Sequence, residues 1–505
     1  MVRAASRFGV EDNELNRKQC MCNLCPSYPH DSRGEILYCA LGSSRCDIRV
    51  KGCICNSCPV YFESKLTSVY YCNKAVAGEN DVEMRKRLKT EDPSFYQSIV
   101  DIKDVAEVGE SLVKSMGSLR KARNSLDDLH FVPAQVAMIP LNADERVRTG
   151  VVIGRKARRP FKVSSPIMLT GMSFGATSKK VKLIIAEVAK KAKVAFNSGE
   201  GGVLDEVIAS ASKYMIMQYA TGRFGVEEGK LKRAAAVEIR FGQGAYPGKG
   251  SYLPAGKITP EIAELRGLQP GEPAVSAAHH PDMTSREDIR SKVAWLRELT
   301  GGVPVGAKIG CGNIEADVEA LVDAGVDFIA LDGFGGGTGA TTPYVRDNVG
   351  IPIIAALPRA RRVLEDLGAR DRVSLIAGGG LRTSADFAKC LALGADAVYI
   401  GTAALIAINC QQYRVCHTGL CPTGVNTNDP RLSALLDFEA GVQRLRNLIR
   451  VSTEEIANFA RIVGKNAVSK LDMSDLVAMN KELANLTGTK WIDGLTYQVP
   501  FPAGI

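Results

Sequence analysis

The chain has 505 residues, a formal net charge of +9, 45% hydrophobic residues and 24% charged residues. This composition is typical of a soluble globular protein, and the length predicts two or three domains of about 100–200 residues each. No apolar run reaches the roughly 18 residues of a membrane span, and the N-terminus lacks the apolar core of a signal peptide. We therefore expect a cytoplasmic protein with no membrane partner. Basic residues are spread along the chain, so no nucleic acid partner is expected.

Nine of the fourteen cysteines lie between Cys20 and Cys72. This segment is an internal duplication, because KQCMCNLCPSYP (18–29) matches KGCICNSCPVYF (51–62). Each copy has the spacing C-x-C-x2-C-P-x12-C, and Cys46 is left over. The two sets, 33 residues apart, are Cys20, Cys22, Cys25 and Cys39, and Cys53, Cys55, Cys58 and Cys72. In a reducing cytosol such density indicates metal thiolates and argues against disulfides.

Residues 1–75 are thus predicted to form a duplicated cysteine-rich metal-binding domain with two metal centres and four thiolates per copy. Three close cysteines, a following proline and one distant cysteine are more typical of ferredoxin-type 4Fe-4S ligation than of zinc sites with paired ligands. Two 4Fe-4S clusters are the preferred interpretation. Two structural zinc ions (Zn) and a disulfide knot are the alternatives.

Residues 76–125 are charged and helical in pattern, which predicts a helical connector. Strand and helix signals then alternate over residues 126–430, and this indicates a parallel sheet with crossover helices. Predicted strands include 194–197, 303–309, 326–331, 351–355, 373–377 and 397–400, separated by helical patterns such as 178–192, 285–299, 314–324 and 358–367. The length favours an α/β closed (β/α)8 TIM barrel over an open sheet. Residues 431–505 are predicted to be a C-terminal helical extension.

Two successive predicted strands end in glycine, at Gly378-Gly379-Gly380 and at Gly401-Thr402. Backbone N–H groups at such positions can approach a phosphate closely. Cys410, Cys416 and Cys421 follow directly with the spacing C-x5-C-x4-C. A phosphate-bearing cofactor and a metal cluster should therefore be neighbours in space. No G-x-G-x-x-G follows a strand, so a nicotinamide-binding Rossmann domain has no support. The isolated Cys311 and Cys390 are interpreted as core residues.

From residue 127 onward the chain resembles the FMN-binding synthase domain of glutamate synthase, and most of all its short archaeal-type large subunit. The resemblance rests on seven motifs in the family's order: GMSFG (171–175), NSGEGG (197–202), GRFGV (222–226), FGQGAYPGKG (241–250), DGFGGGTGA (332–340), AGGGLRT (377–383) and CHTGLCPTGV (416–425). It implies an FMN at the mouth of the barrel and a 3Fe-4S cluster on Cys410, Cys416 and Cys421. His417, inside the cluster loop, is taken as a supporting residue.

The resemblance also implies roles for individual residues. The cofactor-binding residues would be Met172 and Ser173 at the flavin ring, Gln243 and Lys308 at its pyrimidine edge, and Gly336, Gly337, Gly379, Gly380, Gly401 and Thr402 in the glycine loops, the last four at the phosphate. A cation at the pyrimidine edge stabilises reduced, anionic flavin. Arg266 would bind a carboxylate of 2-oxoglutarate, and Glu287 matches a glutamate near which ammonia enters. Lys308, Glu287 and Gln243 are the candidate catalytic residues.

Two residues depart from the family pattern at positions that contact substrate. Tyr246 stands where the family has lysine, and Tyr252 stands where it usually has glutamine. An unpaired buried carboxylate is costly, so either another cation compensates or the substrate differs. Lys249 is the candidate replacement.

The expected reaction is reduction, by a hydride from FMN, of the imine formed from 2-oxoglutarate and ammonia, which gives L-glutamate. Electrons would come from a ferredoxin-like donor through the N-terminal metal centres and the 3Fe-4S cluster. Two other functions remain open: a subunit of the methylamine–glutamate N-methyltransferase type, and an electron-transfer flavin subunit of a larger complex that has no substrate of its own. Val2 stands where a glutaminase domain has its catalytic cysteine, and the glycine-repeat domain of long forms is absent. We therefore expect glutaminase and glycine-repeat partner subunits in an oligomer, or ammonia or an amine from solution.

Overall fold

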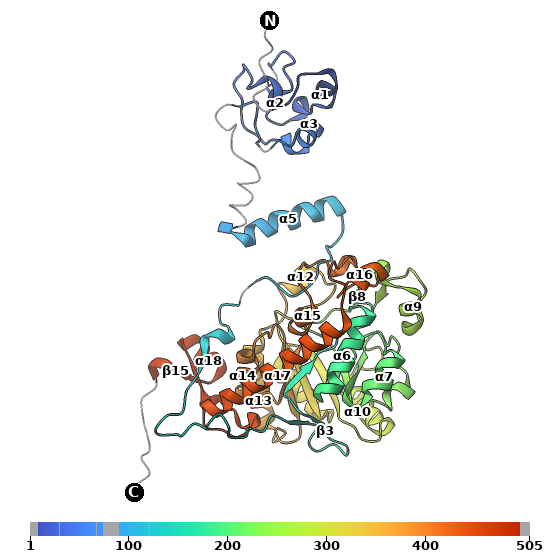
Figure 1. Cartoon of the computed structure of the whole chain (residues 1–505), viewed down its shortest axis with the longest axis vertical. Coiled ribbons are helices and arrows are strands. Elements are labelled where there is room, and N and C mark those ends of the chain that lie inside the picture. The colour runs from blue at the N-terminus through green and yellow to red at the C-terminus, as the bar shows by residue number, and fades with distance from the viewer. Residues whose placement is uncertain (1–8, 30, 67, 74–89, 121, 495–505) are drawn as a thin grey trace. The chain divides into compact units, whose positions relative to one another are not determined.

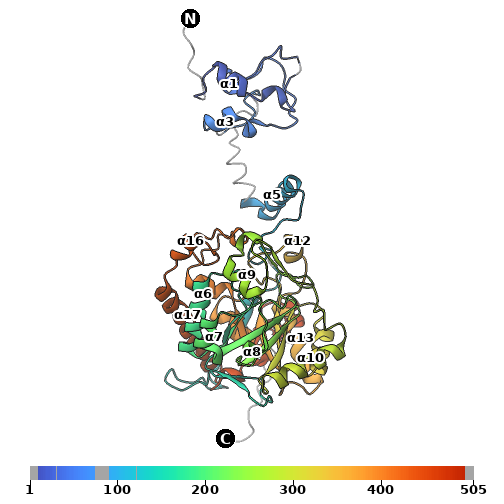
Figure 2. The same cartoon turned by 90° about the vertical axis from the view of Figure 1, so that its right-hand side faces the viewer.

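The computed structural model of the chain describes residues 9–29, 31–66, 68–73, 90–120 and 122–494. These residues fall into two compact units, Met1–Leu112 and Val113–Ile505 (Figure 1 and Figure 2). None of the helices in the described ranges combines the length and apolar character needed to cross a membrane. Lys114, in the segment predicted as a connector, forms an isolated β-bridge with Thr341 of the second unit.

The first unit consists of short helices and loops. Its helices are α1 (Glu14–Gln19), η1 (Cys22–Leu24), α2 (Tyr38–Leu41), η2 (Cys55–Ser57), α3 (Pro59–Glu63) and α5 (Pro93–Val108). Its small core is made of Val10, Leu37, Tyr38, Val60, Tyr61 and Tyr71, and cysteine side chains complete it. None of the fourteen cysteines, all of which lie in the described ranges, forms a disulfide. Of the predicted helical connector, α5 is helical, and residues 74–89 lie outside the described residues.

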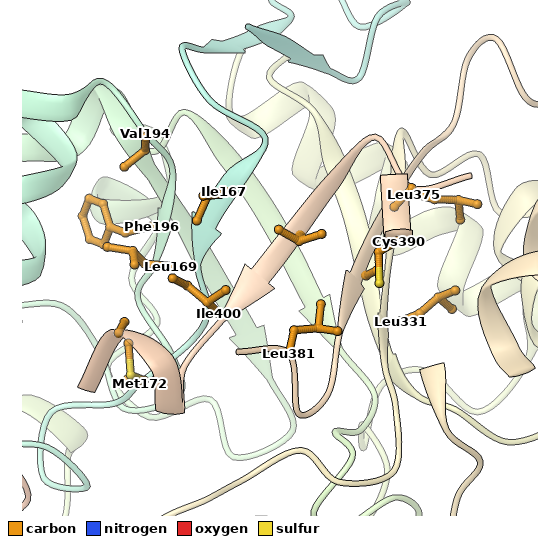
Figure 3. Packing of buried hydrophobic residues seen from close by; sticks show 14 of the residues in the cluster. Ile167, Leu169, Met172, Val194, Phe196, Leu331, Leu375, Leu381, Cys390 and Ile400 are labelled. Atoms are coloured by element: carbon orange, nitrogen blue, oxygen red, sulfur yellow. The ribbon is translucent and has the colours of Figure 1, made fainter. Parts of the chain in front are cut away.

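The second unit contains a closed barrel of eight parallel strands, which confirms the predicted TIM barrel. In chain order these are β4 (Ile167–Leu169), β5 (Phe196–Asn197), β6 (Met215–Ala220), β7 (Ala236–Arg240), β10 (Val305–Gly310), β11 (Phe328–Asp332), β12 (Ser374–Gly378) and β13 (Ala397–Ile400). Each strand pairs with the next, and β13 closes the barrel on β4 with Ile400 opposite Leu169. These two side chains lie next to each other in Figure 3.

Helices cover the outside of the barrel. They are α6 (Lys179–Ala192), α7 (Asp205–Ala211), α8 (Glu228–Leu231), α10 (Arg286–Leu299), α11 (Ile314–Asp323), α13 (Ile353–Asp366), α14 (Ser384–Ala392) and α15 (Thr402–Ile408). One predicted strand is wrong, because residues 351–355 lead into α13 with Pro352 as its N-cap. A short apolar run fits a buried strand and a buried helical turn equally well. Cys311 and Cys390 are buried, as predicted.

The barrel interior is filled by large side chains, among them Met168, Ile216, Phe328 and Tyr399, together with the hairpin of β2 (Val151–Ile153) and β3 (Phe161–Val163). Phe328 can point inward because its neighbour in β10 is Gly306. A Cβ atom at Gly306 would lie 2.4 Å from the Phe328 ring. The interior is therefore a packed core, and ligands can bind only at its open end.

Replacing Phe328 with alanine should lower the free energy of unfolding by about 3–5 kcal/mol, since a fully buried aromatic ring leaves a cavity. Urea denaturation followed by circular dichroism measures this change. Phe95, on α5, is 55% exposed and provides the matched control. An equal loss of stability in Phe95→Ala and Phe328→Ala would contradict this description of the core.

The C-terminal extension is only partly helical, which corrects the prediction. It contains α16 (Pro430–Ala434), α17 (Phe438–Ile462) and α18 (Lys481–Thr487), but also β14 (Leu476–Ala478) and β15 (Lys490–Trp491). These two strands form a sheet with β1 (Leu129–Phe131). The long helix α17 lies along α6 and α15 and buries Val442, Leu445, Ile449 and Ile456 (Figure 1).

Candidate active site

Two adjoining cavities lie where the barrel strands end, at their carboxyl ends, which is where TIM barrels bind their ligands. One has a volume of about 1000 Å³ and the other about 920 Å³. We call the first the glycine-lined cavity and the second the cationic cavity. The residues common to both are Met116, Thr170, Gly171, Gln243, Gly337, Gly401 and Thr402. A ligand in one cavity would therefore be in reach of a ligand in the other.

The glycine-lined cavity brings together the predicted phosphate-binding residues. Its wall includes Gly336, Gly337, Gly379, Gly380, Gly401 and Thr402. Gly379 has φ +105°, and a Cβ atom there would lie 2.4 Å from the Gly333 carbonyl oxygen, so no side chain fits. The bare backbone leaves room for a ligand, and the cations Arg382 and Arg414 line the same wall. This cavity is suited to an anionic group.

Residues 113–119, which were assigned to the connector, form part of the wall of both cavities. Met116 lines both, and Gly117 lines the glycine-lined cavity. The Arg414 guanidinium donates to the Gly117 carbonyl oxygen at 2.5 Å. Ser115 Oγ lies 2.7 Å from His417 Nδ1 and accepts from the His417 backbone N–H at 2.8 Å. His417 thus has a supporting role, and no sequence pattern signalled this segment.

Lys308 projects from β10 into the glycine-lined cavity and is 4% exposed. Its Nζ atom lies 3.0 Å from Asp332 Oδ2 and donates to Thr170 Oγ1 at 3.3 Å. Burial lowers the pKa of Lys308. The charges of Asp332 and Glu238 raise it by more than burial lowers it, so the pKa lies above its usual value. Lys308 is therefore a fixed, buried positive charge. Gln243 lines the same cavity.

A buried carboxylate, Glu238, was missed by the sequence analysis. It is fully buried on β7 and accepts hydrogen bonds from Asn197 Nδ2 (2.8 Å), Gln218 Nε2 (2.8 Å) and the Tyr399 hydroxyl (3.0 Å). A buried charge is tolerated only when it is hydrogen-bonded or paired. The polar residue inside the apolar strand AVEIR was the signal that could have revealed it.

The cationic cavity is lined by Arg240, Arg266 and Lys257 but by only one carboxylate, Glu200. Arg240 pairs with Glu200 at 3.1 Å. Arg266 donates to the Phe174 carbonyl oxygen (2.8 Å), and Lys257 donates to the Ala176 carbonyl oxygen (2.9 Å). Within the described ranges no carboxylate lies at ion-pair distance from Arg266 or Lys257. The cavity therefore has an excess of positive charge.

Three buried polar atoms of the cationic cavity have no hydrogen-bond partner in the described structure. They are Arg240 Nε, Arg266 Nε and Asn426 Oδ1. An unsatisfied buried polar atom costs about 1–3 kcal/mol, and in a native protein it requires an explanation such as a ligand. Together with the excess positive charge, these atoms indicate a site for a small anion.

The residues that depart from the family pattern also line the cationic cavity. Tyr246 is buried and accepts a hydrogen bond from Arg240 at 3.0 Å, and Tyr252 contributes from β8 (Tyr252–Leu253). Met172 and Ser173 line this cavity as well. The tyrosine that replaces the family's lysine is thus in direct contact with another cation.

Two predicted residues lie elsewhere. Lys249 is exposed and donates to the Tyr344 hydroxyl at 3.0 Å, and it lines neither cavity. Glu287 is exposed near the start of α10, pairs with Arg290 at 2.5 Å, and also lines neither cavity. Both side chains lie on the protein surface, whereas Arg240 lines the cationic cavity and contacts Tyr246.

Cys410, Cys416 and Cys421 are buried together beside the cationic cavity. Lys257 lines that cavity and donates to the Cys416 carbonyl oxygen at 3.0 Å, and Cys416 Sγ lies 3.8 Å from Met116 Sδ. The predicted proximity of the cysteines to the glycine loops is therefore present. Among the described residues, no three histidine, cysteine or acidic side chains are arranged to hold a single metal ion.

Lys182 on α6 joins two loops of the site. Its Nζ atom donates to the carbonyl oxygens of Met172 (2.7 Å) and Ser198 (2.8 Å). Burial lowers the pKa of Lys182 to about 7 from 10.5. Between these pH values the unfolded chain binds a proton that the folded chain does not. The free energy of unfolding should therefore rise with pH from about 7 to about 10.5, by up to about 1.4 kcal/mol per pH unit.

Urea denaturation at several pH values, with wild type compared with Lys182→Met, measures this contribution. The rise should be smaller in Lys182→Met and unchanged in Lys190→Met, a variant on the exposed side of the same helix. The same slope in wild type and in Lys182→Met would show that Lys182 titrates normally.

The fold and the two cavities define a TIM-barrel protein with bare glycine loops beside a cationic cavity and three buried cysteines. Residues 96–466 match the family described as conserved region in glutamate synthase. The chain therefore belongs to the glutamate synthase family and is a glutamate synthase-like oxidoreductase. Residues 20–73 match a second family, described as protein of unknown function (DUF2769).

Several relatives have substantial identity to this chain. The glutamate synthase large subunit-like protein of Rhizobium meliloti is 38% identical over 421 residues, which cover 79% of this chain and 95% of that protein. The archaeal glutamate synthase (NADPH) of Archaeoglobus fulgidus is 39% identical over 400 residues, covering 74% and 78%. A solved structure of mutant flavocytochrome b2 with pyruvate bound is 16% identical, has a TM-score of 0.49, and covers 74% of this chain and 82% of its own.

Proposed function

We propose that this protein is an iron–sulfur flavoprotein that binds FMN in the glycine-lined cavity and reduces the imine of a 2-oxo acid, 2-oxoglutarate, to L-glutamate. The single observation that carries this proposal is the pair of adjoining cavities. One is lined by bare glycine backbone and Lys308, and the other by three cations and one carboxylate. A phosphate-bearing cofactor and a dicarboxylate substrate would fit the two cavities side by side.

The residues of the glycine-lined cavity fit FMN. The phosphate would lie on the backbone of Gly379, Gly380, Gly401 and Thr402, with Arg382 and Arg414 as nearby cations. Gly379 supports this assignment, because its φ of +105° and the 2.4 Å contact at its Cβ position leave room for nothing but backbone. Lys308, protonated and buried, would offset negative charge on the reduced flavin ring.

The residues of the cationic cavity fit a dicarboxylate. Arg266 offers a buried guanidinium whose Nε atom has no partner in the described structure, and a guanidinium can bind a carboxylate with two parallel hydrogen bonds. Arg240, held by Glu200 and Tyr246, would supply a second cation for the substrate. The formal excess of two positive charges, three cations against one carboxylate, supports a substrate with two negative charges.

FMN held in the glycine-lined cavity would, once reduced, supply the hydride that the imine carbon requires. The chain's own residues bind and orient the substrate and hold a positive charge near the site of reduction. Glu238, with its three hydrogen-bond donors, fixes Asn197, Gln218 and Tyr399 at the upper end of the barrel. These hydrogen bonds would keep the residues beneath the two ligands in fixed positions. Fixed orientation of two reactants is a major source of rate enhancement.

The three buried thiols of Cys410, Cys416 and Cys421 fit a 3Fe-4S cluster, which needs one protein ligand fewer than a four-iron cubane. Such a cluster passes single electrons. The cysteines border the cationic cavity through Lys257, so electrons would have a short path to the flavin. A ferredoxin-like donor, acting through the N-terminal metal centres, is the proposed source. The name of the Archaeoglobus fulgidus relative includes NADPH, and a partner subunit that oxidises NADPH is the corresponding alternative donor.

Ammonia or an amine is the proposed second substrate, delivered from solution or by glutaminase and glycine-repeat partner subunits. An oligomeric assembly of this kind is also proposed, as is a location in the cytoplasm. Size-exclusion chromatography of the native complex from cell extract would test the assembly.

Anaerobic purification and a substrate titration test the proposed function. We expect about one FMN per chain and a change in the flavin absorbance spectrum on addition of 2-oxoglutarate, because the substrate would lie against the flavin. Absence of flavin after reconstitution with FMN would overturn the proposal. A flavin that responds to no 2-oxo acid would favour the electron-transfer subunit, and a response to glutamate with methylamine would favour the N-methyltransferase type.

A further inference from the structure

The eight repeat cysteines of the first unit surround one common cavity. It is lined by Cys20, Cys22, Cys25, Cys39, Cys53, Cys55, Cys58 and Cys72. Aromatic residues from equivalent positions of both copies complete the lining, Tyr28 with Tyr61 and Tyr38 with Tyr71. The two copies therefore share one interior and do not form two separate cysteine pockets.

The first and fourth cysteines of each copy are brought together by the same backbone turn. Leu37 has φ 58° and Tyr70 has φ 54°, a left-handed conformation that is uncommon for such side chains. The turn directs the Leu37 N–H at Cys20 Sγ (3.2 Å) and the Tyr70 N–H at Cys53 Sγ (3.3 Å). Each turn lies two residues before the fourth cysteine of its copy. Hydrogen bonds of this type stabilise thiolate ligands of iron–sulfur clusters.

The thiol of the third cysteine in each copy forms a hydrogen bond with the backbone of the other copy. The Cys25 thiol donates to the Gly52 carbonyl oxygen (3.6 Å), and Gly52 directly precedes the first cysteine of the second copy. The Cys58 thiol donates to the Gln19 carbonyl oxygen (3.8 Å), and Gln19 directly precedes the first cysteine of the first copy.

Ser27 stabilises this contact between the two copies through two hydrogen bonds. Its hydroxyl donates to the Gly52 carbonyl oxygen at 2.5 Å and accepts from the Lys51 N–H at 2.8 Å. The segment that follows Cys25 is thereby fixed to the start of the second copy.

The neighbours of the fourth cysteines show the same arrangement. Cys39 lies near Cys20 and Cys58, and Cys72 lies near Cys25 and Cys53. Each fourth cysteine therefore has the first cysteine of its own copy and the third cysteine of the other copy as neighbours.

We propose that the first unit holds two adjacent four-thiolate centres with exchanged ligands: Cys20, Cys22 and Cys39 with Cys58, and Cys53, Cys55 and Cys72 with Cys25. The centres take 4Fe-4S clusters. A four-iron cluster attaches each of its four thiolates to a different iron atom, and three close cysteines with one distant cysteine suit that ligation. Exchange of a ligand between two copies is also the arrangement in two-cluster ferredoxins.

The exchange makes the two centres interdependent, because neither copy supplies all four ligands of a centre. It also places both clusters in one cavity, close enough to pass electrons between them. This inference concerns residues 20–72 only, and it holds whether or not the barrel performs the proposed reduction.

Crossed double variants of the full chain test the exchange. Cys20→Ser/Cys58→Ser removes two ligands of one proposed centre, and Cys20→Ser/Cys25→Ser removes one ligand from each. Iron and acid-labile sulfide are counted after anaerobic purification, with Cys46→Ser as the control because Cys46 lies outside both sets. We expect Cys20→Ser/Cys25→Ser to lose about twice as much iron as Cys20→Ser/Cys58→Ser, and the control to lose none. The reverse ratio would assign each centre to a single copy.

Partial removal of metal followed by alkylation tests the same point without substitutions. Trypsin releases Cys20, Cys22 and Cys25 in the peptide 19–33, and Cys53, Cys55 and Cys58 in the peptide 52–65. In a chain that has lost one centre, exchange predicts two labels on one peptide and one label on the other. Three labels on one peptide and none on the other would overturn the exchange. This readout stays decisive even if both double variants lose all their iron. Zinc without labile sulfide would overturn the assignment to 4Fe-4S clusters.

Discussion

Replacing Lys308 with methionine should lower the rate of flavin-dependent 2-oxo acid reduction about 10²–10³-fold, the usual effect of removing one preorganised charge-stabilising group. Lys308 is the buried cation of the glycine-lined cavity, and its pair with Asp332 at 3.0 Å holds it in place. Without it, negative charge on the reduced flavin would have no fixed counter-charge, and Asp332 would be left unpaired. The flavin midpoint potential should therefore become more negative in Lys308→Met.

Stopped-flow reoxidation and a redox titration of the bound flavin measure both effects. Lys162→Met is the matched control, because Lys162 is exposed on β3, outside both cavities. If Lys308→Met keeps the wild-type potential while its rate falls, Lys308 acts through folding or substrate binding and has no direct effect on the flavin.

Replacing Arg266 with methionine should raise the KM for 2-oxoglutarate about 10–100-fold, because hydrogen bonds to charged groups contribute about 1.5–3 kcal/mol each. Arg266 is 6% exposed, lines the cationic cavity, and has no carboxylate partner among the described residues. Arg266→Lys should recover only part of the affinity, since lysine cannot donate two parallel hydrogen bonds to one carboxylate. The flavin content should remain that of wild type.

Steady-state kinetics with 2-oxoglutarate, compared with a monocarboxylic 2-oxo acid, provide the measurement. Arg286→Met is the control, because Arg286 is exposed on α10 and pairs only with Glu319 in the described structure. A KM for 2-oxoglutarate that is unchanged in Arg266→Met would place the substrate carboxylates elsewhere, with Arg240 and Lys257 as the remaining cations.

The barrel was predictable from sequence because its strands are short apolar runs between helical patterns. The prediction for residues 397–400 coincides with β13, and the strand predicted at 373–377 differs from β12 by one residue at each end. The strand predicted at residues 351–355 was wrong, because an apolar run of that length fits the buried first turn of α13 as well as a strand. The strands β14 and β15 were missed because three or two residues are too few to show a period.

The candidate site was predicted where function depends on local motifs and missed where it depends on tertiary contacts. The glycine loops and the triad of Cys410, Cys416 and Cys421 are contiguous in sequence, and the fold brings them together. Glu238 and the ion pair of Arg240 with Glu200 depend on partners far away in the chain, so no spacing pattern reveals them. For Lys249, closeness in sequence did not give closeness in the fold. It is near Tyr246 in sequence, but its side chain lies on the surface.

A single-turnover experiment tests the central claim most directly. The protein is reduced anaerobically until its flavin is bleached, and 2-oxoglutarate and ammonium are then added together. We predict that the flavin absorbance returns and that L-glutamate forms in an amount at least equal to the flavin, because reduced clusters supply further electrons, with neither change when one substrate is omitted. A flavin that stays reduced with both substrates present, in a protein whose flavin and iron contents are complete, would contradict the proposed function.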